Sequence, residues 1–365
     1  MKSLLPIVTA MALALLLTGC VIQPPDPTTA PAAPPETTAP SYTGWVDTEE
    51  GRSYYGQDGT KRTGWLDDAG QRYYLDENGV TLRGMQQLQG KRFYFRDDGS
   101  VVTGWLTLGE DTYYFGMDGS MITGLMNIAG KGYYFGADGR RFSGWLELEG
   151  GAYHFDEQGI MAVGPREVDG QMHYFSPRGI RVPLANPWNP VPADYQVELV
   201  NVTDRDRLER NCAEALQIML ADLEAAGHKY FIASAYRTQD EQQYLFDRKV
   251  NFYLEWEYPL AEAEALAATS VAVPGTSEHQ LGLAVDICDL EYEILDDYQA
   301  NTETQKWLMA HCHEYGFILR YPKGTTDITG IIYEPWHYRY VGVDIAREII
   351  NLGITLEEYL GAAKS

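Results

Sequence analysis

The chain has 365 residues, which is enough for two or three domains, and 45% of them are hydrophobic, which suffices for a buried core. Its 28 Lys and Arg residues against 52 Asp and Glu residues give a net charge of −24, which argues against nucleic acid or anionic lipid as a partner. We interpret this charge as a contribution to solubility.

Residues 1–20 have the features of a targeting signal. Lys2 supplies the positive charge, and the apolar run from Leu4 to Leu17 is too short to span a membrane. The segment Leu17-Thr18-Gly19-Cys20 resembles a bacterial lipobox. That resemblance implies a lipoprotein signal peptide, cleavage before Cys20, and a lipid on Cys20 that anchors the protein at the outer face of the membrane. Ordinary secretion, with Cys20 incidental, is the alternative.

Two further features fit an exported protein. Beyond position 20 the cysteines are Cys212, Cys288 and Cys312, so at most one disulfide can form among them, and Cys288 with Cys312 is the pairing we predict. Residues 21–41 are rich in Pro, Thr and Ala and are predicted to form an extended tether. At about 3 Å per residue, this tether would hold the rest of the chain roughly 60 Å from the lipid.

Residues 42–182 carry a twenty-residue periodicity. Short aromatic clusters alternate with turns that mostly contain Asp-Gly. A short aromatic strand, an Asp-Gly turn and a second strand at a fixed period predict a solenoid of seven stacked β-hairpins. The two series of repeated glycines are Gly44, Gly64, Gly84, Gly104, Gly124, Gly144 and Gly164, and Gly59, Gly79, Gly99, Gly119, Gly139, Gly159 and Gly179.

These units resemble the cell-wall-binding, choline- or glucan-binding, repeats of Gram-positive surface proteins. Choline recognition needs an aromatic box around a quaternary ammonium, and in that family one wall of the box is a Trp just before the Tyr-Tyr pair. We therefore expect a wall glycan or wall polymer as the ligand rather than choline, with a passive spacer as the alternative. The positions of that Trp hold Ser53, Arg72, Arg92, Thr112, Gly132, Ala152 and Met172, while the Gly-Trp aromatic survives as Trp45, Trp65, Trp105 and Trp145.

Residues 183–365 are predicted to form a separate α+β domain, a small and mostly antiparallel sheet flanked by helices. Its start is marked by the Pro-rich segment 181–199. Apolar periodicity and flanking turn residues define the elements. The predicted helices are 206–226, one from Thr238 or Gln239, a stretch within 251–273, 302–315, 343–351 and 355–360, and the predicted strands are 230–235, 283–285 and 317–321.

Two separated stretches of this domain carry residues of the kind that bind zinc. A polar loop with His279 leads into a short strand that ends at Asp286, and His337 lies about fifty residues further on. Two imidazoles and one carboxylate are the ligand set of a catalytic zinc, which keeps a position for water. Glu334 could then act as the base, provided that the chain bends at Pro335. Taken singly, each of these residues could equally be a hydrogen-bonding residue of the core.

The motif Ser277-x-His279-x-x-Gly282-x-Ala284-x-Asp286, followed by Glu334-Pro335-Trp336-His337-Tyr338, resembles the VanY-type D-alanyl-D-alanine carboxypeptidases. The likeness extends from about Leu184 to the C-terminus. It implies one Zn²⁺ per chain, held by His279, Asp286 and His337, with Glu334 as the catalytic base. It also implies a zinc metallopeptidase that trims the terminal D-alanine of peptidoglycan stem peptides.

The same resemblance extends to the substrate side. Ser234-Ala-Tyr-Arg237, with Gln242 five residues later, matches the family's substrate motif. Arg237 could bind the free carboxylate of the substrate bidentately or stabilise the oxyanion. Alternatively, it could pair with a nearby carboxylate of the protein. We expect Ser277 to add a hydrogen bond to the substrate terminus.

Two other functions stay open at this point. One is an L,D-carboxypeptidase acting on tetrapeptide stems, because related sequences carry the same metal motif. The other is a non-catalytic wall-binding surface lipoprotein, against which the complete set of His279, Asp286, His337 and Glu334 argues.

Overall fold

The computed structural model describes residues 42–192 and 195–363, so the predicted signal peptide, Cys20 and the tether lie outside the described residues. The described chain forms two compact units. The first comprises the residues up to Arg83 together with Asp97–Ser100, and the second comprises Gly84–Arg96 and the chain from Val101 onward. Among the described residues, no helix combines the length and the apolar character needed to cross a membrane.

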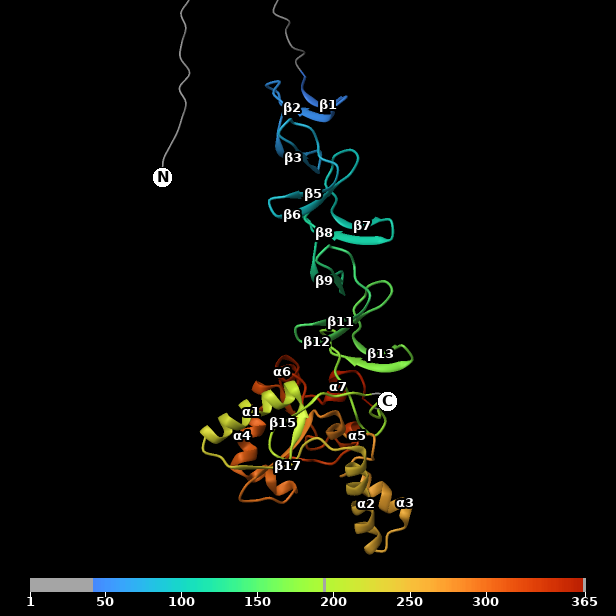
Figure 1. Cartoon of the computed structure of the whole chain (residues 1–365), viewed down its shortest axis with the longest axis vertical. Coiled ribbons are helices and arrows are strands. Elements are labelled where there is room, and N and C mark those ends of the chain that lie inside the picture. The colour runs from blue at the N-terminus through green and yellow to red at the C-terminus, as the bar shows by residue number, and fades with distance from the viewer. Residues whose placement is uncertain (1–41, 193–194, 364–365) are drawn as a thin grey trace, which may run out of the picture. The chain divides into compact units, whose positions relative to one another are not determined.

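The repeats fold as seven antiparallel β-hairpins, as predicted (Figure 1). Two of them belong to the first unit and five to the second. Their strands are β1 (Gly44–Thr48), β2 (Gly51–Tyr55), β3 (Gly64–Asp68), β4 (Gln71–Leu75), β5 (Gly84–Leu88), β6 (Lys91–Phe95), β7 (Gly104–Leu108), β8 (Asp111–Phe115), β9 (Gly124–Ile128), β10 (Lys131–Phe135), β11 (Gly144–Leu148), β12 (Gly151–Phe155), β13 (Gly164–Val168) and β14 (Gln171–Phe175).

The turn that closes each hairpin differs from the prediction. The two strands of a hairpin are joined by the pair before the aromatic strand, such as Ala69-Gly70, whose φ angles are 48° and 75°. Positive φ at both central residues defines a type I′ turn, which matches the twist of the two strands. The Asp-Gly turn instead follows the second strand and, through the bridge between Tyr55 and Lys61, leads the chain toward the next repeat.

Backbone hydrogen bonds and buried rings join successive repeats within the second unit. The amide of Met121 donates to Arg92 O over 2.7 Å, and the amide of Arg141 donates to Thr112 O over 2.8 Å. A side chain on Gly139, which has a φ of 86°, would place its Cβ 2.3 Å from Met121 Sδ. The five repeats of the second unit are therefore a stack in which each hairpin covers its neighbour. The buried rings at the same position of each repeat are Phe95, Phe115, Phe135, Phe155 and Phe175.

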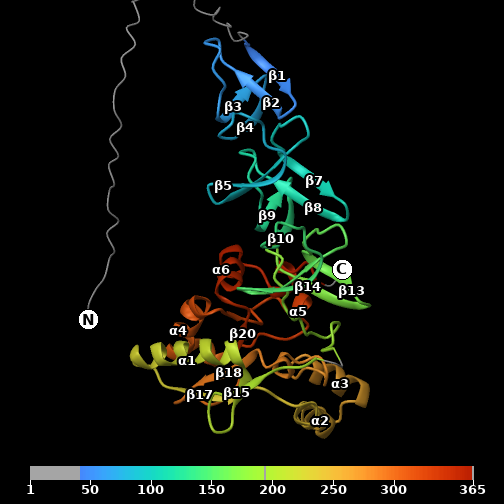
Figure 2. The same ribbon diagram turned by 45° about the horizontal axis from the view of Figure 1, so that its top comes forward.

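The C-terminal part contains a four-stranded antiparallel sheet in the order β17-β18-β20-β19, as the α+β prediction required. Figure 2 shows β17, β18 and β20 lying close together beside α1. In the register of this sheet, Asp286 lies opposite both Ser234 and His337. The strands are β17 (Tyr230–Ser234), β18 (Ala284–Asp289), β19 (Phe317–Leu319) and β20 (His337–Tyr340), and a separate pair consists of β15 (Leu199–Asn201) and β16 (Arg207–Glu209).

The helices follow the predicted periodicity with shifted ends. The first begins at Arg210 rather than at residue 206, because residues 207–209 form β16 and Glu209 caps the helix by accepting from the amide of Cys212. The helices are α1 (Arg210–Ala225), α2 (Gln239–Glu255), α3 (Leu260–Ala268), α4 (Glu303–His311), α5 (Thr326–Thr329), α6 (Val343–Leu352) and α7 (Leu356–Tyr359), and the 3-10 turns are η1 (Glu278–Leu281), η2 (Asp297–Asn301) and η3 (Cys312–Tyr315).

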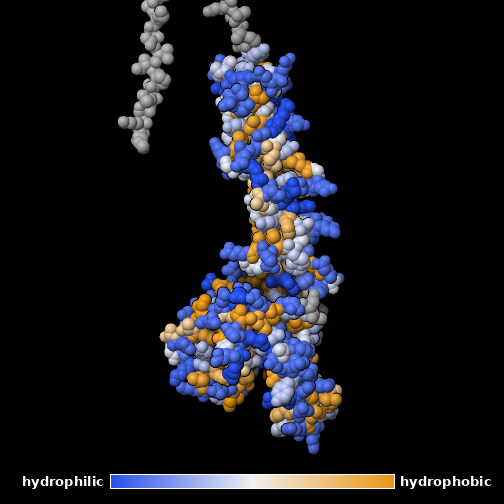
Figure 3. All heavy atoms as spheres, in the orientation of Figure 1, coloured by the Kyte–Doolittle hydropathy of each residue, from blue (hydrophilic) through white to orange (hydrophobic). Residues whose placement is uncertain are grey.

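The pair α2 and α3 packs mainly on itself. Val250 of α2 and Ala263 and Ala267 of α3 form its small core. Large hydrophobic side chains, including those of Phe252 and Leu260, remain exposed over this pair (Figure 3). One face of α2 therefore packs on α3, and other faces are free to meet solvent or the site described below.

The predicted disulfide is wrong. Cys212, Cys288 and Cys312 are all free thiols, and all three are buried. Burial raises the pKa of both Cys288 and Cys312 to about 12. Cys212 and Cys312 lie in the main core cluster, where a thiol packs as a small hydrophobic group.

Candidate active site

A short turn and a glycine place the first two predicted ligands. His279 lies in η1, which is a 3-10 turn rather than the open loop that the sequence predicted. Gly282 ends this turn with a φ of 71°, where a Cβ would meet Glu209 N at 3.1 Å. The chain then enters β18, which continues past Asp286 to Asp289 instead of ending at Asp286. Asp286 is thus held rigidly inside the sheet.

A second turn places the other two residues. The predicted bend at Pro335 is present, since residues 335–336 form a turn in which the amide of His337 donates to Glu334 O over 3.2 Å. His337 is the first residue of β20 and lies directly opposite Asp286. The turn allows Glu334 and His337 to line the same pocket, although a straight strand would separate them.

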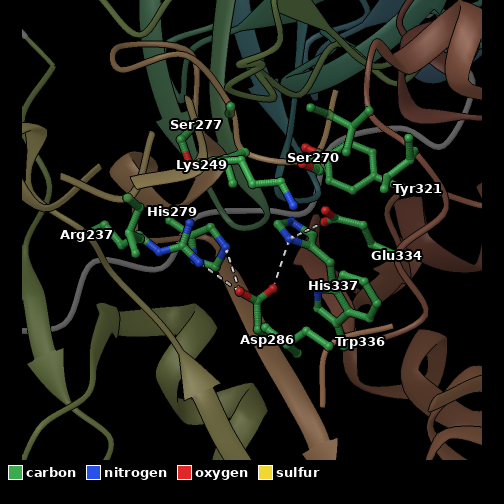
Figure 4. Close-up of a pocket in the computed structure, with 16 residues that line it drawn as sticks. Arg237, Lys249, Ser270, Ser277, His279, Asp286, Tyr321, Glu334, Trp336 and His337 are labelled. Atoms are coloured by element: carbon green, nitrogen blue, oxygen red, sulfur yellow. Dashed lines mark hydrogen bonds and ion pairs between the residues drawn. The ribbon is translucent and has the colours of Figure 1, made fainter. Parts of the chain in front are cut away.

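The structure brings the three predicted zinc ligands together at the base of this pocket (Figure 4). His279 Nε2 lies 3.2 Å from Asp286 Oδ2, and His337 Nδ1 lies 3.1 Å from Asp286 Oδ1. One ligand atom from each residue lies within 4.8 Å of the others. Among the described residues this is the one group of three or more His, Cys, Asp or Glu side chains that could hold a metal ion.

The two histidines of this group differ in protonation. The backbone carbonyl of Ala235 lies 2.6 Å from His279 Nδ1, which leaves Nε2 directed at Asp286. Burial lowers the pKa of His279 to about 4, so its ring is neutral at pH 7. Burial alone would lower the pKa of His337 as well, but bonding to Asp286 and Glu278 outweighs it and raises the pKa to about 9. A metal that binds His337 must therefore displace a proton.

Glu334 stands beside the ligands with the properties of a base. Its Oε2 lies 3.6 Å from His337 Nδ1, and both residues line a pocket of about 300 Å³. Burial raises the pKa of Glu334 to about 8. A carboxyl group whose pKa lies close to the working pH can both accept a proton and return it.

Arg237 points into the site and is held on three sides. Its Nε donates to Ser234 Oγ over 2.8 Å, and its Nη1 donates to Gln242 Oε1 over 3.2 Å. The remaining Nη2 donates to Asp286 Oδ2 over 2.8 Å, so the guanidinium pairs with a carboxylate of the protein. Arg237 and Ser277 line the pocket, whereas Ser234 and Gln242 support Arg237 from outside its lining.

A buried ionic network behind the ligands was not foreseen from the sequence. Glu278 Oε1 accepts from Arg320 Nε over 2.9 Å and from Arg339 Nη1 over 2.6 Å, and all three side chains are fully buried. Glu278 Oε2 faces His337 Nε2 at 3.7 Å. No local sequence pattern could reveal this network, because Arg320 and Arg339 lie 42 and 61 residues from Glu278 along the chain.

Sequence reasoning also missed pocket residues for which a signal existed. Lys249 and Leu245 of α2 line the pocket, together with Tyr321 and Trp336. Residues 242, 245 and 249 recur at helical spacing, so the placement of Gln242 near the site predicts the direction of the other two.

The donor set fits zinc. Two imidazole nitrogens and one carboxylate oxygen converge, and the buried Asp286 Oδ1 has no well-aligned hydrogen-bond partner despite its 3.1 Å approach to His337. Three such ligands with a neighbouring carboxyl group are the arrangement of catalytic rather than structural zinc sites. The α+β fold and this site define the C-terminal part as a zinc metallopeptidase domain.

Comparisons with known proteins agree with that class. Residues 205–343 match the family model VanY, described as D-alanyl-D-alanine carboxypeptidase. Residues 102–139 match a choline-binding repeat, and residues 63–80 match a cell wall binding repeat. The C-terminal part of the chain thus matches the VanY domain, and segments that match cell-wall-binding repeats precede it.

Curated relatives cover the C-terminal half. A D-alanyl-D-alanine carboxypeptidase of Enterococcus faecalis is 44% identical over 181 residues, which are 50% of this chain and 66% of that protein. The bifunctional D-Ala-D-Ala dipeptidase and carboxypeptidase VanXYC of Enterococcus gallinarum is 42% identical over 134 residues, which are 35% of this chain and 64% of that protein. The chain thus spans just under two thirds of each of these relatives.

Solved structures resemble each half. A vancomycin-resistance D,D-pentapeptidase VanY variant in complex with Zn(II) is 45% identical, with 48% of this chain and 97% of that chain covered and a TM-score of 0.45. Choline binding protein F from Streptococcus pneumoniae is 28% identical, with 39% of this chain and 48% of that chain covered and a TM-score of 0.36.

Proposed function

We propose that this protein is a zinc-dependent D-alanyl-D-alanine carboxypeptidase that removes the terminal D-alanine of peptidoglycan stem peptides. The observation that carries the proposal is the convergence of His279, Asp286 and His337 beside Glu334 in a pocket of about 300 Å³. The family match supports the choice of substrate. A solved structure of VanYB, which is 44% identical to this chain, is a complex with D-alanine-D-alanine.

Each residue of the site has a separate role in the proposed reaction. A zinc ion held by His279, Asp286 and His337 would act as a Lewis acid and lower the pKa of water toward neutral pH. Glu334 accepts the proton of the attacking water and returns it to the leaving amine. Its burial, which gives it a high proton affinity, supports this role.

Arg237 stabilises the negative charge that develops on the substrate carbonyl. Its guanidinium lies against Asp286, so it stands next to the position where the carbonyl is attacked. Ser234 and Gln242 fix the orientation of this guanidinium through the two bonds described above, and Gln242 is itself anchored by donating to Ala272 O over 2.7 Å. Ser277, on the pocket wall, offers a hydroxyl to the end of the substrate.

The direct test is product identification with defined peptides. Full-length, zinc-loaded protein is expected to release D-alanine from a stem pentapeptide ending in D-Ala-D-Ala, and a zinc chelator is expected to abolish that release until zinc is restored. Zinc content should be near one per chain. Release of D-alanine from the tetrapeptide alone would replace this proposal with the L,D-carboxypeptidase, and no release from either peptide would leave a non-catalytic wall-binding protein.

The repeats, we infer, hold the enzyme at the wall by binding a wall glycan or polymer. In the first unit the guanidinium of Arg52 lies 4.4 Å above the ring of Trp45, and Arg72 lies 4.1 Å above Trp65, so an arginine already covers these rings. Trp105 is 43% exposed and stands 5.0 Å from the rings of both Tyr114 and Tyr133, which makes an open aromatic surface that suits a sugar ring. We further propose a lipid anchor on Cys20, which rests on the lipobox alone.

Sedimentation with isolated cell walls tests the role of the repeats. Trp105→Ala is expected to weaken wall binding about 2- to 10-fold, the range that corresponds to loss of one aromatic contact. Leu125→Ala is the matched control, because Leu125 occupies the same position in the next hairpin and is 47% exposed. Equal binding by both variants and the wild type would favour a passive spacer.

A further inference from the structure

Lys249 brings a positive charge to the active site that neither the ligand set nor the base requires. It extends from α2 and lines the same pocket as Glu334 and His337. In Figure 4 its ammonium group points inward, toward the space beside these two residues. Burial raises the pKa of Glu334, and the positive charge of Lys249 is one of the effects that oppose this rise. The two side chains therefore interact electrostatically.

Within the described chain, no protein carboxylate forms an ion pair with Lys249. Its Nζ lies 5.5 Å from the rings of both Phe252 and Tyr253, a contact that orients the side chain but leaves its hydrogen-bond donors free. The other cation of the pocket, Arg237, differs in this respect. All three kinds of guanidinium nitrogen of Arg237 already donate to protein oxygens.

The substrate brings the complementary charge. Every carboxypeptidase substrate ends in a free carboxylate, which must leave water when the last peptide bond reaches the catalytic residues. Removing a carboxylate from water is costly unless a cation with free donors meets it. Arg237 already pairs with Asp286, whereas Lys249 is a cation of this pocket that pairs with no carboxylate among the described residues.

We propose that Lys249 binds the C-terminal carboxylate of the stem peptide and thereby selects peptides with a free end. This inference rests on the proposed carboxypeptidase function and assigns the specificity-determining contact of the same site. Lys249 replaces Arg237 in the carboxylate-binding role, which leaves Arg237 to the oxyanion. The helix α2 thus contributes both Gln242, which supports Arg237, and the cation that receives the substrate end.

The test compares a free-acid peptide with its amide. Kinetics of the full-length zinc-loaded protein are measured on diacetyl-L-Lys-D-Ala-D-Ala and on the same peptide with a C-terminal amide. Lys249→Met is expected to lower kcat/KM for the free acid about 10- to 100-fold, mainly through KM, because a charge-assisted hydrogen bond is lost. For the amide, the change should be about 2-fold or less. Lys249→Arg should recover most of the loss.

Two controls isolate the charge in the pocket. Arg248→Met removes a cation from the adjacent position of α2, which is exposed and lies over the ring of Tyr244, and should leave kcat/KM unchanged. Zinc content and thermal unfolding of Lys249→Met should match the wild type, since no hydrogen bond of the fold is removed. A purely structural lysine would instead affect both substrates equally.

The outcomes separate this inference from the proposed function. An unchanged KM for the free acid in Lys249→Met, or equal losses on acid and amide, would overturn the role of Lys249 while the wild type still released D-alanine. A wild-type protein inactive on both peptides would refute the proposed function, and the assignment of Lys249 with it.

Discussion

Glu334→Gln is expected to lower kcat for D-alanine release by about two to four orders of magnitude, the usual contribution of general acid–base catalysis. Glutamine keeps the size and the buried position of the side chain but cannot accept a proton from water. Because Glu334 donates no ligand to the cluster of His279, Asp286 and His337, zinc content should stay near one per chain. Single-turnover kinetics and metal analysis on the same sample measure both quantities.

The stability of this variant should not fall. Burial raises the pKa of Glu334, which means that the fold disfavours its ionised form, and an amide avoids that ionisation. Glu262→Gln, an exposed change on α3, is the matched control and should be fully active. If Glu334→Gln kept more than about a tenth of the wild-type kcat, the proton transfer would belong to another group. If it lost zinc together with activity, Glu334 would be a ligand or a structural residue.

The repeats show which features of a fold sequence periodicity can predict. The period, the number of hairpins and the aromatic positions followed from spacing alone, because each repeat uses the same residues for the same contacts. The closing turn did not, since Ala69 and Gln89 adopt positive φ angles of 48° and 52° although neither residue type suggests it. The register of each hairpin, which pairs Asp68 with Gln71 and Leu88 with Lys91, leaves two residues for the turn and imposes that conformation. The more familiar Asp-Gly pair serves the connection between repeats.

In the peptidase domain, too, some features could be predicted from the sequence and others could not. The metal-binding residues could be proposed because His279 and Asp286 are close in sequence and the turn at Pro335 fixes the spacing of Glu334 and His337. The buried network around Glu278 could not, because Arg320 follows β19, Arg339 lies in β20 and Glu357 lies in α7. The cysteine pairing was wrong because a count of thiols carries no information on their positions. The helical spacing of residues 242, 245 and 249 would have predicted that Lys249 faces the site, if α2 had been interpreted as one wall of the pocket.

Breaking the network at Glu278 is expected to have the largest effect on stability. Glu278 pairs with Arg320 and Arg339, and Arg320 in turn donates from Nη1 to Glu357 Oε2 over 2.9 Å. Two arginines and two glutamates are thus fully buried with balanced charge. Burial opposes ionisation of Glu278, but the two arginines outweigh it and hold the pKa of this carboxyl well below its usual range.

Glu278→Gln would leave one positive charge buried without a partner, so we expect a loss of about 3–5 kcal/mol in the free energy of unfolding. Urea unfolding of the zinc-loaded protein, followed by far-UV circular dichroism, measures it. Glu314→Gln is the matched control, because it also removes a carboxylate from an ion pair, 2.8 Å from His311, but at the surface. That exposed pair should contribute no more than about 1 kcal/mol.

A double variant distinguishes an uncompensated charge from a simple packing defect. Glu278→Gln combined with Arg339→Met removes one charge of each sign, so the remaining pair of Arg320 and Glu357 stays neutral. The double variant should therefore be destabilised by less than the sum of the two single variants, with a coupling energy of about 0.5–3 kcal/mol. Strictly additive losses would show that the side chains are held by shape alone, and the electrostatic explanation of this buried cluster would then be wrong.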